Sequence, residues 1–96
     1  MKYNYNNNFG IIEINNEEIF LTHSENILFG LLYSKKRCTY IELAIKLYGI
    51  VNTDKSSINT IRVYINRINN KIKGIGKIIN INKKGYEFIE NKEDKQ

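Results

Sequence analysis

The sequence predicts one small α+β domain in which short strands flank three central helices. Three observations support this class. The 96 residues allow a single hydrophobic core. The 42% hydrophobic and 11% aromatic content is typical of a globular chain and not of a disordered one. Apolar residues alternate near both ends of the chain but recur at helical spacing in its middle.

The N-terminal part predicts a polar extension followed by a two-stranded hairpin. Residues 1–8 form the extension, and the domain itself is expected over residues 9–90. Residues 9–14 and 17–21 are expected to be strands joined by a turn at Asn15-Asn16. The sequence leaves open whether the first aromatic residues pack on this sheet or contact a second copy; they are Tyr3, Tyr5 and Phe9.

Each of the first two helices is expected to begin at a capping box. In such a box a Thr side chain and a Glu three residues later satisfy backbone N–H groups that the helix leaves unpaired. Thr22 with Glu25 forms the first box, and Thr39 with Glu42 forms the second. Two helix starts are therefore fixed by local chemistry.

The ends of these two helices are also marked in the sequence. The first is expected to run to about Tyr33, because a basic turn over residues 34–37 interrupts its apolar spacing. The second is expected to end at Gly49, a residue type suited to the position after a helix. The apolar side of the second helix is expected to comprise Ile41, Ala44, Ile45 and Tyr48.

The third helix has the clearest periodicity. A polar loop over residues 52–55 precedes it, Ser56 or Ser57 is the expected cap, and Gly74 and Gly76 are expected to end it. Isoleucines spaced three and four residues apart predict one apolar seam facing the core. We refer to these residues as the Ile seam: Ile58, Ile61, Ile65, Ile68 and Ile72.

The chain is expected to end in a basic hairpin. Residues 78–82 and 86–89 form its strands, Lys83-Lys84-Gly85 joins them, and residues 91–96 are expected to be a disordered tail. A short helix pair, a long helix and a basic hairpin in this order are typical of a winged helix-turn-helix domain. We call the hairpin the wing.

Charge indicates a polyanionic partner. The net charge of +5 is uneven, at −3 over residues 1–34, +10 over 35–86 and −2 over 87–96. A polyanion would therefore meet the middle and C-terminal part of the chain.

Other functional classes lack support in the sequence. One Cys and one His exclude a zinc finger or a disulfide framework, and the carboxylates stand in no acid–base motif, so we expect no enzyme, metal or cofactor. Apolar runs are too short to cross a membrane, and residues 1–10 do not resemble a signal peptide. A single free Cys38 suits the cytoplasm.

The polar residues of the third helix are candidate DNA contacts, because Arg can pair with guanine and Asn with adenine in the major groove. These candidates are Arg67, Arg62, Tyr64, Asn66, Thr60 and Lys71. Asn82, Lys83 and Lys84 at the wing tip are candidates for a minor groove, and Lys36 and Arg37 for the phosphate backbone. The alternative for each is an ordinary solvent-exposed residue.

Several motifs together resemble the OmpR/PhoB-type winged-helix effector domain. Residues 59–72, NTIRVYINRINNKI, are similar to its recognition helix, and INKKGYEFI is similar to its wing. LTHSE (21–25) and TYIELAIKLYG (39–49) resemble its first-helix entry and second helix. The resemblance covers roughly residues 9–89 and implies binding of double-stranded DNA, with Arg67 at a base-contacting position.

Two departures from this family pattern affect the expectation. The family usually carries a phosphoacceptor receiver domain that this sequence lacks, so we expect no aspartyl-phosphorylation switch in the chain. Asn66, Asn69 and Asn70 stand where the family is rich in Arg, and Asn82 stands where it often inserts an Arg into the minor groove. The basic contribution is therefore expected to shift from the helix toward the wing.

The sequence supports sequence-specific DNA binding in one of two roles. The chain is expected to be a transcription regulator, or an accessory factor resembling the winged-helix relaxosome proteins of clostridial conjugative plasmids. Expected partners are AT-rich duplex DNA with direct repeats, a second copy of the chain on DNA, and RNA polymerase or DNA-transfer proteins. The alternative is a winged-helix protein-interaction module, which would place an apolar patch on the third helix.

Overall fold

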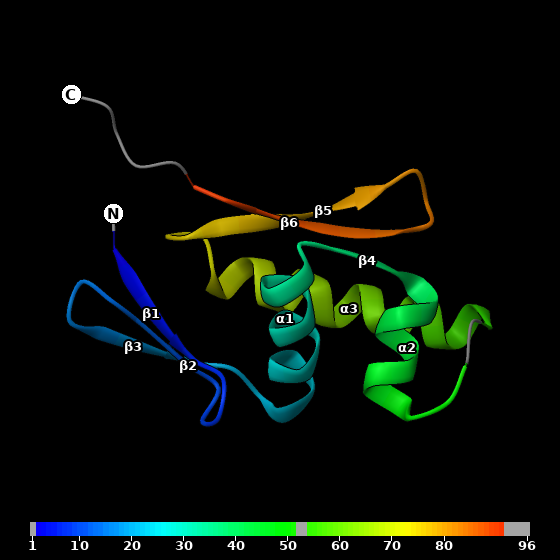
Figure 1. Ribbon diagram of the computed structural model, residues 1–96, viewed down its shortest axis with the longest axis horizontal. Coiled ribbons are helices and arrows are strands. Elements are labelled where there is room, and N and C mark those ends of the chain that lie inside the picture. The colour runs from blue at the N-terminus through cyan, green and yellow to red at the C-terminus, as the bar shows by residue number, and fades with distance from the viewer. Residues whose placement is uncertain (1, 52–53, 92–96) are drawn as a thin grey trace.

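A computed structural model describes residues 2–51 and 54–91 (Figure 1). Its elements alternate between two small sheets and three helices. They are β1 (Tyr3–Asn6), β2 (Ile11–Ile14), β3 (Glu17–Phe20), α1 (His23–Lys35), β4 (Arg37–Thr39), α2 (Tyr40–Tyr48), α3 (Lys55–Lys71), β5 (Gly76–Ile81) and β6 (Gly85–Glu90). Within this part of the chain, none of the helices has the length and apolar character needed to span a bilayer.

The N-terminal sheet has one strand more than the sequence predicted. β1, β2 and β3 pair antiparallel in that order, and Asn15 and Asn16 form the expected turn with positive φ angles of 53° and 65°. Residues 3–6, which we had assigned to an extension, form β1. Their alternation was missed because the inward residues, Tyr3 and Tyr5, stand among polar asparagines.

Tyr3 and Tyr5 pack on the first helix, which answers the question that the sequence left open. The Tyr5 ring lies 4.9 Å from that of Phe29, and the Tyr3 ring lies 6.4 Å from that of Tyr33. Phe9, in contrast, is 75% exposed. The aromatic pairs hold the N-terminal sheet against α1.

The helix starts confirm both capping boxes and correct the third cap. The reciprocal bonds of Thr22 with Glu25 and of Thr39 with Glu42 are both present. α3 is capped by Asp54 and not by Ser56 or Ser57, since the Asp54 carboxylate accepts a 2.8 Å bond from the Ser57 backbone N–H. The helix therefore begins at Lys55. Gly49 ends α2 with φ of 81°, as expected.

The basic turn predicted over residues 34–37 is wrong in part. α1 continues to Lys35, and β4 follows as a third strand of the wing sheet, whose order is β4-β6-β5. β4 has three residues and is defined by its partner strand, so local pattern could not reveal it. The pairing depends on Gly85, where an added Cβ would lie 2.2 Å from the Cys38 carbonyl oxygen.

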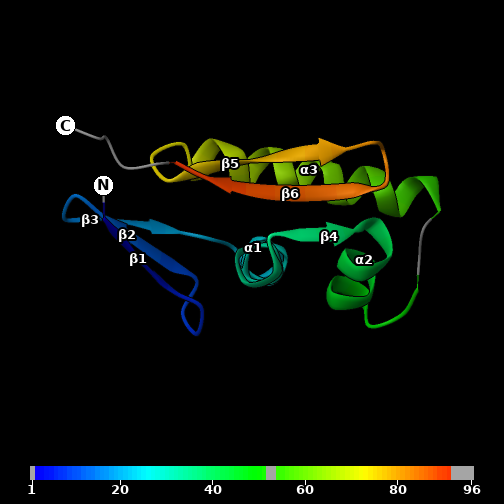
Figure 2. The same cartoon turned by 45° about the horizontal axis from the view of Figure 1, so that its top comes forward.

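The Ile seam builds the core as predicted. Ile61, Ile65, Ile68 and Ile72 are buried, and Ile58 is half-buried at the start of the helix. The wing runs along α3 in both views (Figure 1; Figure 2). The seam meets buried residues of α1 and of the wing, among them Leu28, Phe29, Leu32, Ile78 and Phe88.

The predicted apolar side of α2 is confirmed at Ala44 and is wrong at Ile41, Ile45 and Tyr48. Leu43 and Ala44 face the core, whereas Ile41 and Ile45 are 47% and 44% exposed and Tyr48 is also exposed. Most residues of α2 are apolar, so its periodicity fits more than one rotation about the helix axis. Packing against α1 and α3 selects the face.

An ion pair joins α3 to the start of α1. Lys71 Nζ donates to the Glu25 carboxylate at 2.6 Å and to the Phe20 carbonyl oxygen at 2.9 Å, and Glu25 is only 1% exposed. Burial by itself raises the pKa of Glu25, but the bonds from Lys71 and from the Thr22 backbone outweigh it and lower that pKa. One carboxylate thus caps α1 and anchors α3.

We predict that Lys71→Met lowers the free energy of unfolding by about 3 kcal/mol at neutral pH, because Glu25 stays buried without its partner. Urea denaturation measures this loss. Lys73→Met, an exposed change of the same kind, should cost little. Adding Glu25→Gln to Lys71→Met should restore part of the stability. Equal stability of the Lys71 and Lys73 variants would contradict a structural role for the Lys71–Glu25 ion pair.

The same pair predicts that Lys71→Met changes how stability depends on pH. In the native chain the folded pKa of Glu25 is lowered, so its contribution is present at neutral pH and is lost as pH falls through that pKa. In Lys71→Met the bond and charge of Lys71 are lost, so burial, the largest cause, is opposed only by the bonds from Thr22, and the pKa of Glu25 rises above its value in the native chain. Acidification from about pH 7 to about pH 5 should then stabilise the variant relative to the native chain. Unfolding curves at both pH values test this.

Candidate nucleic-acid interface

α3 exposes a polar face opposite the Ile seam. A helix turns about 100° per residue, so positions displaced by two from a buried isoleucine point away from the core. The exposed set comprises Asn59, Arg62, Val63, Asn66, Arg67 and Asn70. Three of these, Arg62, Asn66 and Arg67, were predicted as DNA contacts.

Three of the candidate contacts on α3, namely Thr60, Tyr64 and Lys71, are half-buried. Tyr64 packs against the core cluster, and Lys71 Nζ is held by Glu25. Thr60 donates its hydroxyl to the Ser56 carbonyl oxygen at 3.0 Å. Arg67 is exposed, with its guanidinium carbon 5.9 Å from the centre of the Tyr64 ring. Tyr64 therefore supports Arg67 instead of projecting beside it.

A row of polar side chains on α3 faces the wing and consists of Arg62, Asn66 and Asn69. The Asn69 amide bonds both ways to Ile78 of β5, donating to its carbonyl oxygen at 2.9 Å and accepting from its N–H at 2.7 Å. This side chain is a structural clamp between α3 and the wing. Arg62 donates to Asn59 Oδ1 at 3.1 Å, which holds its guanidinium along the helix surface. Asn66 lies exposed between them in sequence.

A groove of about 630 Å³ separates this row from the wing. It combines positive charge with amide groups, a combination that suits phosphate and base edges. The polar residues lining it include Arg62, Asn66, Asn69, Asn80 and Lys83. α3 and the wing thus contribute side chains to one groove. Figure 2 shows α3 running beside β5 and β6.

The wing tip is built from residues in the left-handed conformation. Asn82 and Lys83 have φ of 51° and 58°, and the Lys84 N–H donates to the Ile81 carbonyl oxygen at 2.9 Å. Asn tolerates this conformation, whereas Lys strains it. Asn80 holds the tip: its Oδ1 accepts from the Lys83 N–H at 2.8 Å, and its Nδ2 donates to the Tyr40 hydroxyl at 2.7 Å.

The structure does not bring Lys36 and Arg37 to this surface. Arg37 pairs with Glu87 at 3.2 Å on the face of the wing sheet opposite Cys38 and Tyr86, which point to the core. Lys36 Nζ lies 5.0 Å and 5.1 Å from the ring centres of Tyr33 and Phe88. Both cations have partners within the fold, away from α3.

Cys38 has the environment of a core residue. It is 3% exposed, and burial together with the nearby Glu42 carboxylate raises the pKa of its thiol to about 11. The thiol is therefore protonated at neutral pH and is a poor nucleophile.

The exposed face of α3 contains residues that sequence reasoning missed. Asn59 and Val63 were absent from the predicted contacts, and Asn70 was considered only as a departure from the family pattern. The Ile seam could have identified these residues, because positions 59, 63, 66 and 70 lie on the side of the helix opposite the seam. The predicted contacts were instead chosen largely among the Arg and Lys positions beside them.

The fold and this surface define a winged helix-turn-helix domain, which confirms the predicted fold class. The DNA-binding domain of Bacillus subtilis CssR superposes with a TM-score of 0.76 at 18% identity, over 92% of this chain and all of that one. The C-terminal domain of the nisin resistance regulator NsrR gives 0.69 at 23% identity, over 90% and 89%.

A third solved structure extends the comparison. The DNA-binding domain of response regulator AdeR, in complex with an intercistronic region, gives a TM-score of 0.66 at 13% identity, over 92% of this chain and 94% of that one. No protein-family model and no curated protein matches the sequence. The similarity therefore lies in the fold, which these three domains share with the chain.

We predict that Lys83→Gly stabilises the domain by about 1 kcal/mol, because glycine adopts the positive φ at this position without strain. Thermal unfolding measures the gain. Lys84→Gly, which changes the adjacent residue of the same tip, should give no such gain because residue 84 does not have a positive φ. A loss of stability in Lys83→Gly would show that the side chain supports the turn.

Proposed function

We propose that the chain binds double-stranded DNA sequence-specifically, with α3 in the major groove and the wing in the adjacent minor groove. The observation that carries the proposal is the surface formed by the exposed face of α3, the amide-lined groove and the Lys83 tip. An α-helix fits the major groove, and Arg and Asn on it can read base edges. The contacts that we propose are Arg67, Arg62, Asn66, Asn82, Lys83 and Lys84.

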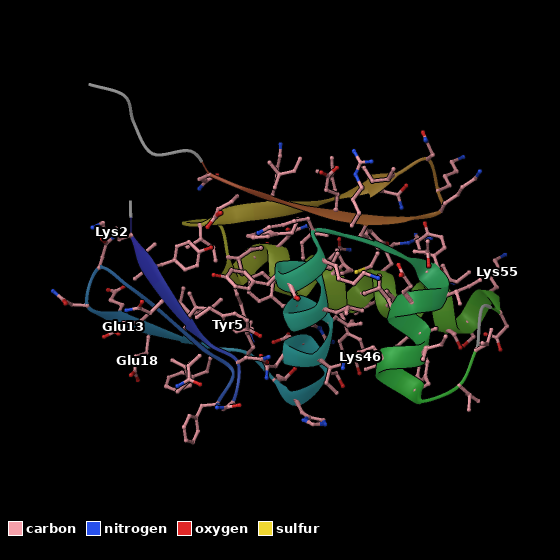
Figure 3. The ribbon with its side chains drawn as sticks, in the orientation of Figure 1. Lys2, Tyr5, Glu13, Glu18, Lys46 and Lys55 are labelled. Carbon is pink, nitrogen blue, oxygen red and sulfur yellow. The ribbon has the colours of Figure 1, made fainter. Side chains whose placement is uncertain are left out.

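The distribution of charge supports this orientation. Figure 3 places Glu13 and Glu18 on the N-terminal sheet, at the opposite end of the molecule from Lys55 at the start of α3. The acidic sheet would therefore lie away from a DNA phosphate backbone bound at the start of α3 and the wing tip. Such a separation steers the basic surface toward a polyanion.

Two biological roles fit this surface. The domains of NsrR and AdeR are described as parts of response regulators and that of CssR as a DNA-binding domain, which favours transcription regulation for this chain. The alternative role is that of a relaxosome accessory factor in plasmid transfer. The two differ in the location of the bound site, at a promoter or at a transfer origin.

AT-rich sites and paired binding complete the proposal. The narrow minor groove of AT-rich DNA has enhanced negative potential, which favours Lys83 and Lys84 at the wing tip. A single module covers little DNA, so useful specificity calls for two copies, which we propose bind direct repeats. Contact between these two copies would not use the Tyr3 and Tyr5 rings, because both rings pack on α1 within the fold.

A protein-interaction function has one observation in its favour. α2 and the residues after it expose Ile41, Ile45, Tyr48, Ile50 and Val51. We had expected an apolar patch on the third helix for this alternative, and it lies on α2 instead. We propose this face for a protein partner that acts together with DNA binding, such as RNA polymerase or a DNA-transfer protein.

Selection from a random duplex library at near-physiological salt tests the DNA proposal. We predict an enriched AT-containing motif, repeated at fixed spacing, and a slope of log K against log salt of about −4.5 if five phosphates are neutralised. Weak binding to all sequences without enrichment would remove specific recognition from the proposal. A strict palindrome would contradict the tandem arrangement.

Charge reversal at the wing tip tests which cations bind. We predict that Lys83→Glu/Lys84→Glu weakens binding to the selected site at least 100-fold, because two phosphate or minor-groove contacts become repulsive. The matched control is Lys2→Glu/Lys46→Glu, which changes net charge equally away from the proposed surface. Equal losses in the two variants would show that only net charge matters.

The α2 face is tested separately. Ile41→Ser/Ile45→Ser should leave DNA affinity unchanged, since both residues lie outside the α3 and wing surface. Binding of purified RNA polymerase to the protein–DNA complex should weaken if this enzyme is the partner. Lost DNA affinity in this variant would place α2 in the DNA interface.

A further inference from the structure

The side of α3 that lies opposite the Ile seam consists largely of residues that were not among the predicted DNA contacts. Asn59, Val63, Asn66 and Asn70 are spaced four, three and four residues apart and lie opposite the Ile seam. We call this set the outward stripe. An inference about it rests on the proposed function, because it concerns what α3 reads once it lies in a major groove.

Val63 is the apolar centre of the outward stripe. Its side chain is 46% exposed and is surrounded in sequence by the exposed Arg62, Asn66 and Arg67. A β-branched residue lowers helix propensity, so an exposed Val does not assist the helix that carries it. In the major groove the apolar group that a Val can meet is the C5-methyl of thymine.

The amides of the outward stripe are available for a ligand. Within residues 2–51 and 54–91, the side chains of Asn66 and Asn70 make no hydrogen bond, whereas Asn69 uses both amide atoms on Ile78. Asn59 accepts from Arg62 with Oδ1, an oxygen that has a second lone pair. An Asn side chain matches adenine, accepting from N6–H and donating to N7.

The cations beside the stripe have other orientations. Arg62 is drawn along the helix by Asn59, on the side that lines the wing groove, and Arg67 lies over the Tyr64 ring on the opposite side. Arg62 and Arg67, whose guanidinium groups could pair with guanine, thus lie on either side of the outward stripe and not at its centre. The central positions hold one methyl-bearing and three amide side chains.

We propose that the outward stripe reads A·T base pairs from the major groove, with Val63 on a thymine C5-methyl and Asn66 and Asn70 on adenine edges. This adds a direct major-groove preference to the indirect minor-groove preference of the wing. The two preferences differ in the atoms that they use, so they can be separated by chemically modified DNA.

Deoxyuridine tests the Val63 contact, because it lacks only the C5-methyl of thymine and leaves the minor groove unchanged. Each thymine of the selected site is replaced in turn. We expect about a fourfold loss of affinity at one or two positions, the value of one buried methyl group. Val63→Ala, which favours the helix and so preserves folding, should bind thymine and deoxyuridine sites equally. Val51→Ala, at a 63% exposed Val outside α3, should keep the native ratio.

7-Deazaadenine tests the amide contacts, because it removes the N7 acceptor in the major groove. We expect about a tenfold loss at particular adenines, absent in Asn66→Ala for one position and in Asn70→Ala for another. Failure of all duplexes to show specific binding would overturn the proposed function and this inference with it. Specific binding that is insensitive to both modified bases, or G·C pairs at the central positions, would overturn this inference alone.

Discussion

The rotation of α3 about its own axis is the constraint on which the rest of the molecule depends. The Ile seam faces the core, and Lys71 fixes the same rotation at the last turn through the buried Glu25. Glu25 also caps α1, so the same carboxylate binds the start of the first helix and the end of the third. A buried ion pair contributes little net stability by itself, but its loss leaves a charge without a partner. The Lys71–Glu25 pair therefore determines how α3 is oriented relative to α1 more than it adds to the stability of the fold.

The position of the wing follows from α3. Asn69 binds both backbone groups of Ile78, and Asn80 joins the tip to Tyr40 at the start of α2. Gly85 lets β4 approach closely enough to pair with β6. These polar and steric contacts hold the hairpin along α3, where its strained tip presents Lys83. Strain at a lysine in the left-handed region is consistent with a side chain kept for binding and not for folding.

The proposed interface divides into a part that supplies affinity and a part that supplies specificity. Lysines of the wing tip suit phosphates and a narrow minor groove, whose potential depends on DNA shape. The outward stripe of α3 carries no charge and suits base edges. Apolar residues exposed on α2 lie outside both parts, which leaves that face for protein contacts.

The sequence alone determined the features that depend on local chemistry. Features that follow from neighbouring residues are both capping boxes, the Asn15-Asn16 turn, the Gly49 helix end and the Ile seam. The order of these elements also indicated the winged-helix class. Only the tertiary structure decided features that depend on distant partners. β1 and β4 exist because other elements pair with or cover them. Packing turns Leu43 and Ala44 of α2 inward, a choice that its mostly apolar sequence leaves open. Lys71 and Asn69 look like surface residues of a helix, yet Glu25 and Ile78 lie 46 and 9 positions away and give them structural roles. Residue type and spacing fix which backbone conformations a segment favours, whereas long-range packing decides which of its side chains remain free to bind.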